Sequence, residues 1–247
     1  AIDIDPFGTP TPVIDSALRT LRKKKGLLLV TATDTAPLVG KFKKAAYRKY
    51  GIHLDKTPFG TELGVRALIS FLERMSAKYN IALKPMFGFF LRNFIKVCLV
   101  SIPGKKAVDK FAEKIGFIIY KNGEIQEIPK KNINKTTKII GPIWLSEIFD
   151  KEFTKKCIEK LKVLPIGEKT KMELTKWLTA EIKTTHIRFF YNIERIASSL
   201  KKPTPKISAV IQIIKEKGYI AERTHFDPKA IKTDAPYELI IDIVRSL

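Results

Sequence analysis

The chain opens with the stretch Ala1–Gly8, which reads Ala-Ile-Asp-Ile-Asp-Pro-Phe-Gly. From Ile2 the residues alternate between apolar and acidic, which predicts a short strand ending at Asp5. Apolar residues then recur at helical spacing through residues 13–24, and Leu27–Thr33 is an apolar run of strand length. A strand, a helix and a second strand within about 30 residues form a βαβ unit. The opening of the chain therefore predicts an α/β fold with parallel strands covered on both faces.

The rest of the first domain, which we place at residues 1–145, continues as α/β. The run Lys105–Ile115 predicts a helix, and Gly116 is expected to end it in a left-handed conformation. The pair Asn122-Gly123 predicts the tight turn of a hairpin over Phe117–Ile128. The other expected elements are a helix over Thr61–Tyr79, a hairpin joining Lys84–Phe90 to Phe94–Val100, and an exit from the domain at Gly141–Trp144.

The second domain, which we place at residues 146–247, is predicted to be mostly helical. Expected helices cover Lys151–Val163, Glu168–Thr184, Asn192–Leu200 and Pro205–Lys217, and a strand covers Tyr219–Phe226. Two helices joined by a short turn and followed by a strand give the order of a winged helix, a relative of the helix-turn-helix. Many proteins with this order bind no nucleic acid, so the pattern predicts a winged-helix-like domain without fixing its partner.

The charge of the chain is strongly positive. Lysine and arginine number 46 against 25 aspartates and glutamates, which gives a formal net charge of +21. Such an excess favours a polyanionic partner, because each phosphate that a cation neutralises releases condensed counterions. A lysine-rich genome or a hot habitat is the alternative, although glutamate would then be expected to rise with lysine. A membrane surface ranks third, since no strongly amphipathic basic helix stands out, and no apolar run reaches the length of a membrane span.

The two cysteines are Cys98 and Cys157, which lie far apart in apolar surroundings. With three histidines they form neither a disulfide framework nor a zinc ligand set, so no metal site is expected. Free thiols suit a reducing compartment, and the first residues do not read as a signal peptide. The expected location is cytoplasmic.

The loop Asp5-Pro6-Phe7-Gly8 follows a parallel strand, which is where open α/β sheets bind their ligands. The Asp5 carboxylate and the Pro6 carbonyl are two acceptors that could take both hydrogens of an exocyclic amine and direct its lone pair at an incoming methyl group. Phe7 offers a flat face for a nucleobase, worth about 1–3 kcal/mol. Gly8 permits a close backbone approach. Taken alone, these four residues are explained more simply by an ordinary Asp-Pro turn.

Further motifs change that balance. The loop resembles the Asp-Pro-Pro-Tyr-like motif of amino-methyltransferases, and motifs along nearly the whole chain, in order, resemble those of the tRNA guanine-26 N2-dimethyltransferase family. The tail carries the most specific of them. The matching stretches are Ile2–Pro10, Asp15–Arg19, Val30–Asp34, Ala36–Leu38, Gly40, Arg48–Tyr50, Gly141–Leu145, Arg223–Phe226, Ile231–Thr233 and Ala235–Glu238.

The resemblance implies a Rossmann-like class I methyltransferase domain, here its C-terminal part, followed by a family-specific domain that binds RNA. The implied reaction moves one or two methyl groups from S-adenosylmethionine to N2 of a guanine in tRNA. The base must leave its stack to react, which costs a few kcal/mol. The implied roles are orientation of the amine by Asp5 and the Pro6 carbonyl, stacking by Phe7, and a base pocket lined by Gly8, Thr33 and Asp34. For Asp34, capping the next turn is an equally open alternative.

Two features of the family pattern are missing. The family's glycine-containing donor loop and its acidic ribose-binding residue precede the Asp-Pro-Phe-Gly loop, and no glycine-rich loop after a strand replaces them here. We therefore expect cofactor binding to reside mostly in an N-terminal methyltransferase half, on the same or a separate polypeptide, and this chain alone to be inactive. Many relatives carry cysteine pairs for zinc in the region equivalent to Phe117–Ile140, which has none, so zinc is not expected.

Six residues are candidates for contact with tRNA: Lys23, Lys24, Arg92, Arg223, His225 and Lys232. Arg92 stands among phenylalanines and could contact phosphate or stack on a base, although an arginine lying along a sheet is the commoner outcome. For His225, packing inside the protein is the commoner alternative. Lys23 and Lys24 are either phosphate contacts or solvated surface.

Two other functions stay open at this point. One is a non-catalytic tRNA-binding subunit or remnant that has lost its donor half, and the other is a winged-helix module that binds DNA. The intact Asp5–Gly8 loop argues against decay, because a remnant has no physical reason to keep both the acceptors and the stacking face. DNA binding leaves residues 1–145 unexplained.

Overall fold

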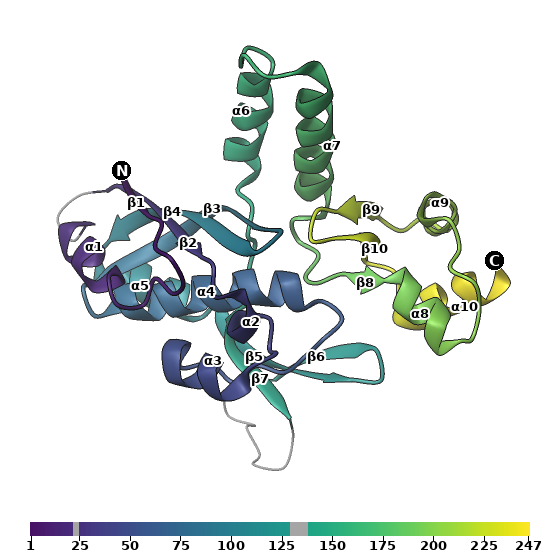
Figure 1. Ribbon diagram of the computed structural model, residues 1–247, viewed down its shortest axis with the longest axis horizontal. Coiled ribbons are helices and arrows are strands. Elements are labelled where there is room, and N and C mark those ends of the chain that lie inside the picture. Colours follow the sequence, from purple (N-terminus) through teal and green to yellow (C-terminus); the bar gives the residue numbers. More distant parts are fainter. Residues whose placement is uncertain (22–24, 129–137) are drawn as a thin grey trace. The chain divides into compact units, whose positions relative to one another are not determined.

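The computed structural model describes residues 1–21, 25–128 and 138–247. The chain divides into two compact units, Ala1–Ile148 and Phe149–Leu247, each with its own helices and strands (Figure 1). Lys23 and Lys24, two of the predicted tRNA contacts, lie outside the described residues. Among the residues described, no helix combines the length and the apolar composition that crossing a membrane requires.

The first unit is built on a four-stranded mixed sheet with the order β1-β2-β4-β3. Strand β1 (Ile2–Ile4) pairs in parallel with β2 (Leu27–Ala32), and helix α1 (Ile14–Leu21) connects them. This confirms the predicted βαβ unit. Strands β3 (Ile81–Leu91) and β4 (Phe94–Pro103) form the predicted hairpin, and β4 runs antiparallel to β2. The parallel part of the sheet is thus the pair β1 and β2.

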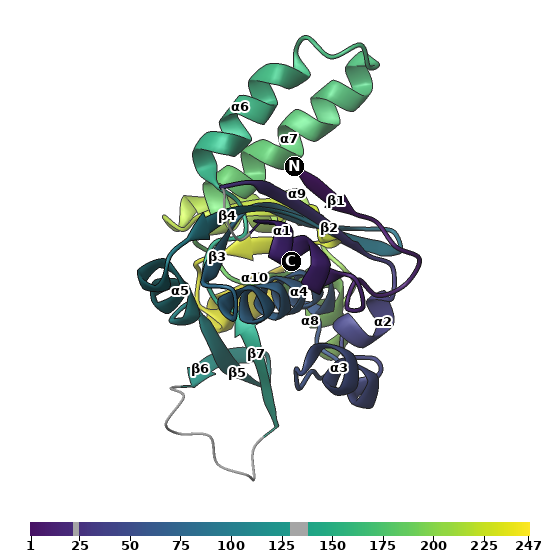
Figure 2. The same ribbon diagram turned by 90° about the vertical axis from the view of Figure 1, so that its left-hand side faces the viewer.

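One face of this sheet packs against helix α4 (Gly60–Ala77), which lies beneath it in both ribbon views (Figures 1 and 2). Alternate residues of β2 and β4 point toward that face and are fully buried. Two glycines bring the helix and the sheet close together. A Cβ on Gly64 would lie 3.0 Å from Ile95 Cδ1, and one on Gly88 would lie 2.7 Å from Val65 Cγ1. Only glycine allows this packing distance without a shift of the neighbours.

The opposite face of the sheet is less covered. Leu27, Leu29, Phe94 and Val100 all point to it and are half-buried. Strand β1 stands at the end of the strand order, so one of its edges has no strand partner among the described residues. The open edge of the described sheet offers unpaired backbone N–H and C=O groups, and this face offers apolar side chains.

Two short helices follow β2: α2 (Thr35–Leu38) and α3 (Lys43–Tyr50), which ends at Gly51 in a left-handed conformation. Helix α5 corrects one prediction. It covers Lys105–Ala112, and Gly116 does not end it but lies in strand β5 (Ile115–Lys121). A Cβ on Gly116 would lie 2.5 Å from Leu145 Cδ1, so that position needs glycine for packing and not for a helix stop.

Strand β5 belongs to a second sheet with the order β6-β5-β7. Its turn into β6 (Glu124–Ile128) is Asn122-Gly123, with φ of 54° and 92°. Positive φ at both residues is what a type I′ hairpin turn requires, so this prediction is confirmed. The stretch Gly141–Trp144, expected as the exit from the domain, is instead the body of strand β7 (Ile139–Trp144).

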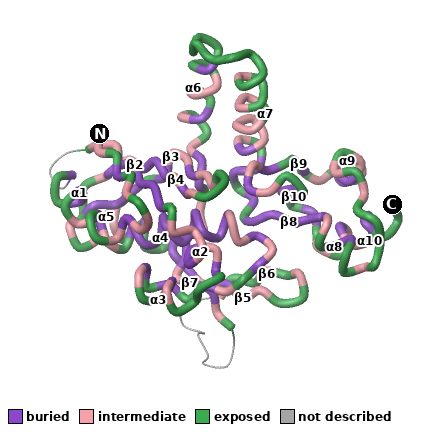
Figure 3. The backbone as a smooth tube through the Cα atoms, in the orientation of Figure 1, coloured by how far each residue is buried: buried purple, intermediate pink, exposed green. Residues whose placement is uncertain are grey.

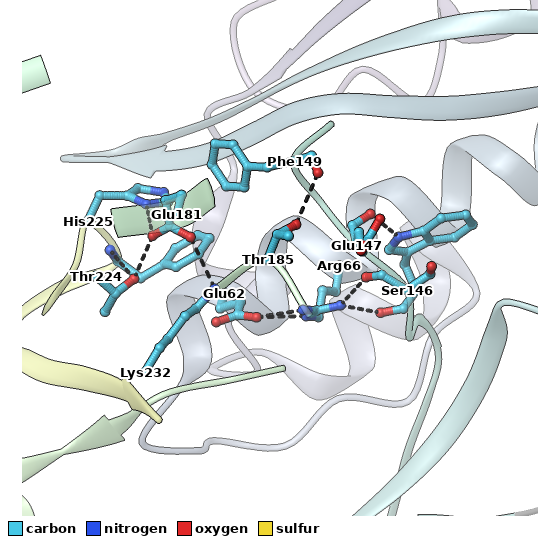
Figure 4. A network of polar contacts seen from close by, with 12 residues as sticks. Glu62, Arg66, Ser146, Glu147, Phe149, Glu181, Thr185, Thr224, His225 and Lys232 are labelled. Carbon is cyan, nitrogen blue, oxygen red and sulfur yellow. Dashed lines mark hydrogen bonds and ion pairs between the residues drawn. The ribbon is translucent and has the colours of Figure 1, made fainter. Parts of the chain in front are cut away.

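A buried arginine of α4, paired with a glutamate one turn earlier, joins this helix to the end of β7 and the segment after it. Arg66 Nη2 lies 2.7 Å from Glu62 Oε1, and both side chains are buried. Arg66 Nη1 also donates to the carbonyls of Trp144, at 3.0 Å, and Ser146, at 2.8 Å (Figure 4). The buried guanidinium is therefore both charge-paired and hydrogen-bonded, as a buried charge must be.

The second unit starts with two antiparallel helices, α6 (Lys151–Leu161) and α7 (Glu168–Thr184), both as predicted. The Asp150 carboxylate accepts a hydrogen bond of 2.8 Å from the Phe153 amide and so caps α6. A three-stranded antiparallel sheet with the order β8-β10-β9 follows. The remaining elements are β8 (Tyr191–Asn192), α8 (Ile193–Ser199), α9 (Ile207–Glu216), β9 (Ala221–Thr224), β10 (Asp227–Thr233) and α10 (Tyr237–Ser246).

The sequence predicted α8, α9 and β9 but assigned no element to the last twenty residues. Strand β10 and helix α10 bury Ile231, Ile240 and Val244 fully against α8 and α9. The tail thus completes the core of the second unit.

Candidate active site

The loops that follow the two parallel strands meet at one edge of the sheet. The Gly8 amide donates to Thr33 Oγ1 at 2.6 Å, and the Thr33 amide donates to the Gly8 carbonyl at 2.9 Å. The Asp34 amide points at the same carbonyl, at 3.4 Å. Gly8 has a φ of +93°, a conformation that favours glycine. The three residues predicted to line a base pocket are therefore brought together by direct hydrogen bonds.

Asp5 and Phe7 stand free of the body of the first unit. The Phe7 ring is fully exposed, and Asp5 makes no hydrogen bond or ion pair with any described residue. Asp3, two residues earlier and within β1, binds Lys96 Nζ at 3.1 Å. The ring face of Phe7 and both carboxylate oxygens of Asp5 are therefore free to contact a ligand.

Asp34 has a structural task that the sequence did not show. Its Oδ1 accepts a 2.6 Å hydrogen bond from the Tyr50 hydroxyl, and its Oδ2 lies 3.0 Å from Lys49 Nζ. Burial, with the Asp34 carboxylate second, raises the pKa of Tyr50 above its usual range, so the phenol stays a donor. Thr9 Oγ1 donates to the Tyr50 oxygen at 3.0 Å.

Asp34 occupies the position before α2, yet its side chain makes no cap hydrogen bond there. The carboxylate instead ties the end of β2 to α3 and, through Tyr50 and Thr9, to the loop after Gly8. Sequence reasoning missed Lys49 and Tyr50 as partners. They lie in the motif Arg48–Tyr50 of the family resemblance, which is the signal that could have found them.

The turn between β3 and β4 lies at the same edge of the sheet. Ala32, the last residue of β2, pairs with Ile95, so the turn residues continue beside Thr33. Arg92 is exposed in this turn, in a left-handed conformation with a φ of 51°. A cation therefore stands within the first unit, at the edge that carries the Asp5–Gly8 loop.

The other predicted tRNA contacts lie in the second unit, and they differ in exposure. Arg223 is exposed and donates to the Pro228 carbonyl at 3.1 Å. The side chains of His225 and Lys232 are buried, with exposed fractions of 2% and 3%. In this position neither can reach a phosphate, so a tRNA contact by either has no support from its surroundings.

His225 and Lys232 surround a buried carboxylate, Glu181 of α7 (Figure 4). Its Oε1 lies 2.8 Å from His225 Nδ1 and accepts a 3.0 Å hydrogen bond from Thr224 Oγ1. Its Oε2 lies 3.2 Å from Lys232 Nζ. Burial by itself raises the pKa of Glu181, but the Lys232 and His225 side chains outweigh it and hold that pKa below its usual range.

These contacts tie α7 to β9 and β10 in the second unit. The ring of Trp177 packs on His225 with centroids 5.0 Å apart. Two of the tail motifs of the family resemblance, Arg223–Phe226 and Ile231–Thr233, thus meet at one buried carboxylate. Among the described residues, no group of three or more histidine, cysteine, aspartate or glutamate side chains is placed to hold a metal ion.

Comparison with known proteins identifies the family to which the chain is similar. Residues 1–245 match the family model described as N2,N2-dimethylguanosine tRNA methyltransferase. The chain is 32% identical over 249 residues to a tRNA (guanine(26)-N(2))-dimethyltransferase of Pyrococcus horikoshii, covering 100% of this chain and 64% of that protein. It is 33% identical to the enzyme of the same name from Methanocaldococcus jannaschii, covering 98% and 64%.

A solved structure is similar as well. The complex of Trm1 from Pyrococcus horikoshii with S-adenosyl-L-methionine superposes with a TM-score of 0.88 at 32% identity, over 98% of this chain and 65% of that one. The α/β fold, with its mixed sheet and helices, is thus that of a known methyltransferase structure. The chain spans about 64% of the length of the first curated relatives it matches.

Proposed function

This chain belongs to the N2,N2-dimethylguanosine tRNA methyltransferase family, and on that basis we propose that it forms the methyl-acceptor side of a tRNA guanine N2-methyltransferase. One or two methyl groups pass to N2 of a guanine, at position 26 by analogy with the relatives' names. S-adenosylmethionine, when bound, would supply the methyl group by breaking its S–CH3 bond and would leave as S-adenosylhomocysteine. The observation that carries this proposal is the Asp5–Gly8 loop, which presents an unpaired carboxylate and a fully exposed ring at the end of a parallel strand.

The Asp5 carboxylate and the Pro6 carbonyl each accept one of the two N2 hydrogens of the guanine. These bonds direct the nitrogen lone pair away from the loop and stabilise the positive charge that grows on N2 as the new N–C bond forms. One N2 proton leaves once the nitrogen is cationic, and Asp5 is the nearest base. Phe7 holds the base flat against the loop by stacking, worth about 1–3 kcal/mol.

The base pocket is proposed at Gly8, Thr33 and Asp34. The Gly8–Thr33 hydrogen bonds fix the two loops together, and the Asp34–Tyr50 bond holds the second loop on α3. Asp34 acts here mainly as a positioning residue, because both of its carboxylate oxygens are already engaged. A preorganised loop loses less entropy when it orients the amine.

The donor site is proposed to lie outside these 247 residues, in a methyltransferase half on the same or a separate polypeptide. The described strands offer no glycine-rich loop that could hold the donor. The open edge of β1 and the half-buried face around Leu29 and Phe94 support the addition of further chain to this sheet. The residues described thus act on the acceptor, and no step is assigned to them on the donor.

The second unit is proposed as a winged-helix-like domain that binds tRNA. Its order from α7 onward is helix, strand, helix, helix and then the hairpin of β9 and β10, which supports the assignment. We assign residues 1–145 to the methyltransferase domain and residues 146–247 to RNA binding. Arg92 and Arg223 keep their proposed tRNA contacts because both are exposed.

The test is nucleoside mass spectrometry on an unmodified tRNA transcript incubated with S-adenosylmethionine. The chain is assayed alone and together with a polypeptide that supplies the remaining part of the family's length. We expect methylguanosine in the second reaction and none in the first. If the complemented reaction gives no product while tRNA is still bound, the chain is a non-catalytic tRNA-binding subunit.

A further inference from the structure

The loop between α6 and α7 exposes apolar side chains at the end of a helical hairpin. Val163, Leu164 and Ile166 are 76%, 44% and 36% exposed, and Met172 on the first turns of α7 is 73% exposed. Val163, Leu164, Pro165 and Ile166 are consecutive and all exposed, and the loop joining α6 to α7 is coloured as exposed in Figure 3. Such a run on a folded surface is unfavourable unless something binds it.

Hydrogen bonds hold this loop in a defined shape. The amides of Val163 and Ile166 donate to the carbonyls of Lys160, at 3.1 Å, and Leu164, at 2.9 Å. The Lys171 ammonium donates to the Lys162 carbonyl at 3.3 Å and so links the end of α6 to the start of α7. The apolar side chains are therefore displayed by an ordered backbone, and they do not fold back onto the hairpin.

Lysines surround the apolar loop. Residues 151–184 contain nine lysines and five glutamates, and Glu181 is the buried carboxylate already described. Lys162, Lys169 and Lys176 are exposed near the loop. A hollow of about 510 Å³ lies beside it, lined by Lys162, Glu168, Lys171, Met172, Thr175 and Lys176.

We propose that the α6–α7 hairpin is an RNA-docking arm, whose lysines bind phosphates while its apolar loop packs on unstacked bases. The partner, tRNA, rests on the proposed function; the arm is the new element. Phosphate contacts explain the lysines but not the valine, leucine and isoleucine, which need an apolar surface. Unpaired nucleotides in RNA loops offer phosphates and an apolar surface together, since splayed bases expose their faces next to the charged backbone. Proteins that bind the minor groove of DNA likewise insert leucine, isoleucine or proline side chains between bases.

The test measures the affinity of the full chain for an unmodified tRNA transcript at several salt concentrations. One variant reverses three charges, Lys162→Glu, Lys169→Glu and Lys176→Glu. A second variant removes the apolar side chains of the loop by Val163→Ser, Leu164→Ser and Ile166→Ser. The matched control reverses three exposed lysines of α5 with the same change in net charge: Lys105→Glu, Lys106→Glu and Lys110→Glu. Circular dichroism verifies that all variants are folded.

The charge variant is expected to lose affinity at least about thirtyfold, with a salt slope lower by about two to three, since each lost phosphate contact removes about 0.7–0.9. The loop variant is expected to lose affinity about tenfold with its salt slope unchanged, because it removes base contacts alone. An equal loss of tRNA affinity in the α5 control, or an unchanged tRNA affinity in the loop variant, would overturn the proposal that the hairpin is a docking arm.

Anionic vesicles of phosphatidylcholine and phosphatidylserine serve as the second probe. If the two hairpin variants lose vesicle binding but keep tRNA affinity, the loop is a membrane contact and the proposal is wrong. Failure of the tRNA assignment is distinguishable from failure of the arm. If the unmodified chain binds no tRNA, the proposed function itself fails. If it binds tRNA and the hairpin substitutions do not change the affinity, only the proposal of a docking arm fails.

Discussion

Asp5 in the first unit and Glu181 in the second are carboxylates treated in opposite ways by the fold. Asp5 is exposed and has no partner among the described residues, while Glu181 is buried and contacts Thr224, His225 and Lys232. Asp5 lies in one motif of the family resemblance, and Glu181 contacts residues of two others, Arg223–Phe226 and Ile231–Thr233. The buried carboxylate is fully occupied in holding its unit together, and the exposed one keeps its oxygens for a ligand.

Glu73 of α4 is an intermediate case. It is buried, its Oε2 accepts a 2.6 Å hydrogen bond from the Leu83 amide, and no cation described lies within ion-pair distance. Burial raises its pKa to about 8. Burial without a cation thus favours the protonated acid at Glu73, whereas burial beside Lys232 and His225 favours the ionised form at Glu181.

The largest effect is expected from Glu181→Gln. The substitution leaves the Lys232 ammonium buried without its counter-ion, so the second unit should lose about 3–5 kcal/mol of unfolding free energy. Urea unfolding followed by hydrogen exchange in peptides from residues 168–247 measures it. The control is Glu222→Gln, whose carboxylate pairs with Lys183 and Lys215 near the surface and should cost less than about 1 kcal/mol.

The same variant has an expected pH dependence. The folded pKa of Glu181 is depressed, so its stabilising contribution is present above the unfolded pKa of roughly 4.5 and is lost as pH falls below it. The difference between the parent chain and Glu181→Gln should therefore shrink on acidification. A difference that grows toward acidic pH would show that the carboxylate is not held ionised.

The next effect is expected from Glu73→Gln. Because the folded pKa is raised to about 8, folding favours the protonated acid, and stability should fall as pH rises from roughly 4.5 through 8. The amide cannot ionise, so between pH 5 and pH 9 the variant should gain roughly 4 kcal/mol of unfolding free energy relative to the parent. Unfolding of the first unit at both pH values tests this, and parallel pH profiles would contradict it.

A smaller effect is expected from Phe7→Ala, which removes the proposed stacking face. Turnover on tRNA in the complemented reaction should fall about tenfold to a hundredfold, the equivalent of about 1–3 kcal/mol, and affinity for tRNA should fall less. Stability should not change, because the ring is fully exposed. Phe42→Ala is the control, since that ring is 62% exposed and lies outside the loop. Equal turnover in the two variants would remove the stacking role.

The smallest effect is expected from Arg92→Ala. An exposed cation that contacts one phosphate contributes about a fivefold change in affinity, and its loss should lower the salt slope of tRNA binding by about one. Lys232→Met is the variant for comparison, because it removes a buried lysine. It should destabilise the second unit and leave the salt slope of tRNA binding unchanged. A lowered slope for the folded Lys232→Met variant would restore the predicted tRNA contact of Lys232.

The sequence predicted the parts of the fold that local patterns determine. The βαβ unit, the Asn122-Gly123 turn and helices α6 and α7 all follow from periodicity and turn chemistry within short segments. The end of α5 was not predicted correctly, because a glycine after a helical pattern usually marks the end of a helix. Gly116 instead packs against Leu145, a contact that depends on a residue far along the chain.

In the candidate site, too, local patterns predicted the contacts between neighbouring segments but not those between distant ones. The Asp5–Gly8 loop and its contact with Thr33 follow from two adjacent parallel strands. The burial of His225 and Lys232 did not follow, since charged residues are exposed by default and their partner Glu181 lies 44 and 51 positions away. The link from Asp34 to Tyr50 likewise depends on where α3 packs.

The most direct test of the central claim compares Asp5→Asn with Asp3→Asn. The two aspartates lie two residues apart, Asp3 within β1 and Asp5 just after it, and both are exposed. Asparagine keeps the size of each side chain and removes its charge. The measurement is the rate of methylguanosine formation by the complemented reaction, together with affinity for tRNA.

Asp5→Asn should lower the rate at least about a thousandfold, since it loses the negative charge that stabilises the cationic nitrogen and the base that takes its proton. Its tRNA affinity should stay within about twofold of the parent, and Asp3→Asn should change neither quantity appreciably. A rate for Asp5→Asn within about tenfold of the parent would contradict the assignment of the methyl-acceptor site to the Asp5–Gly8 loop.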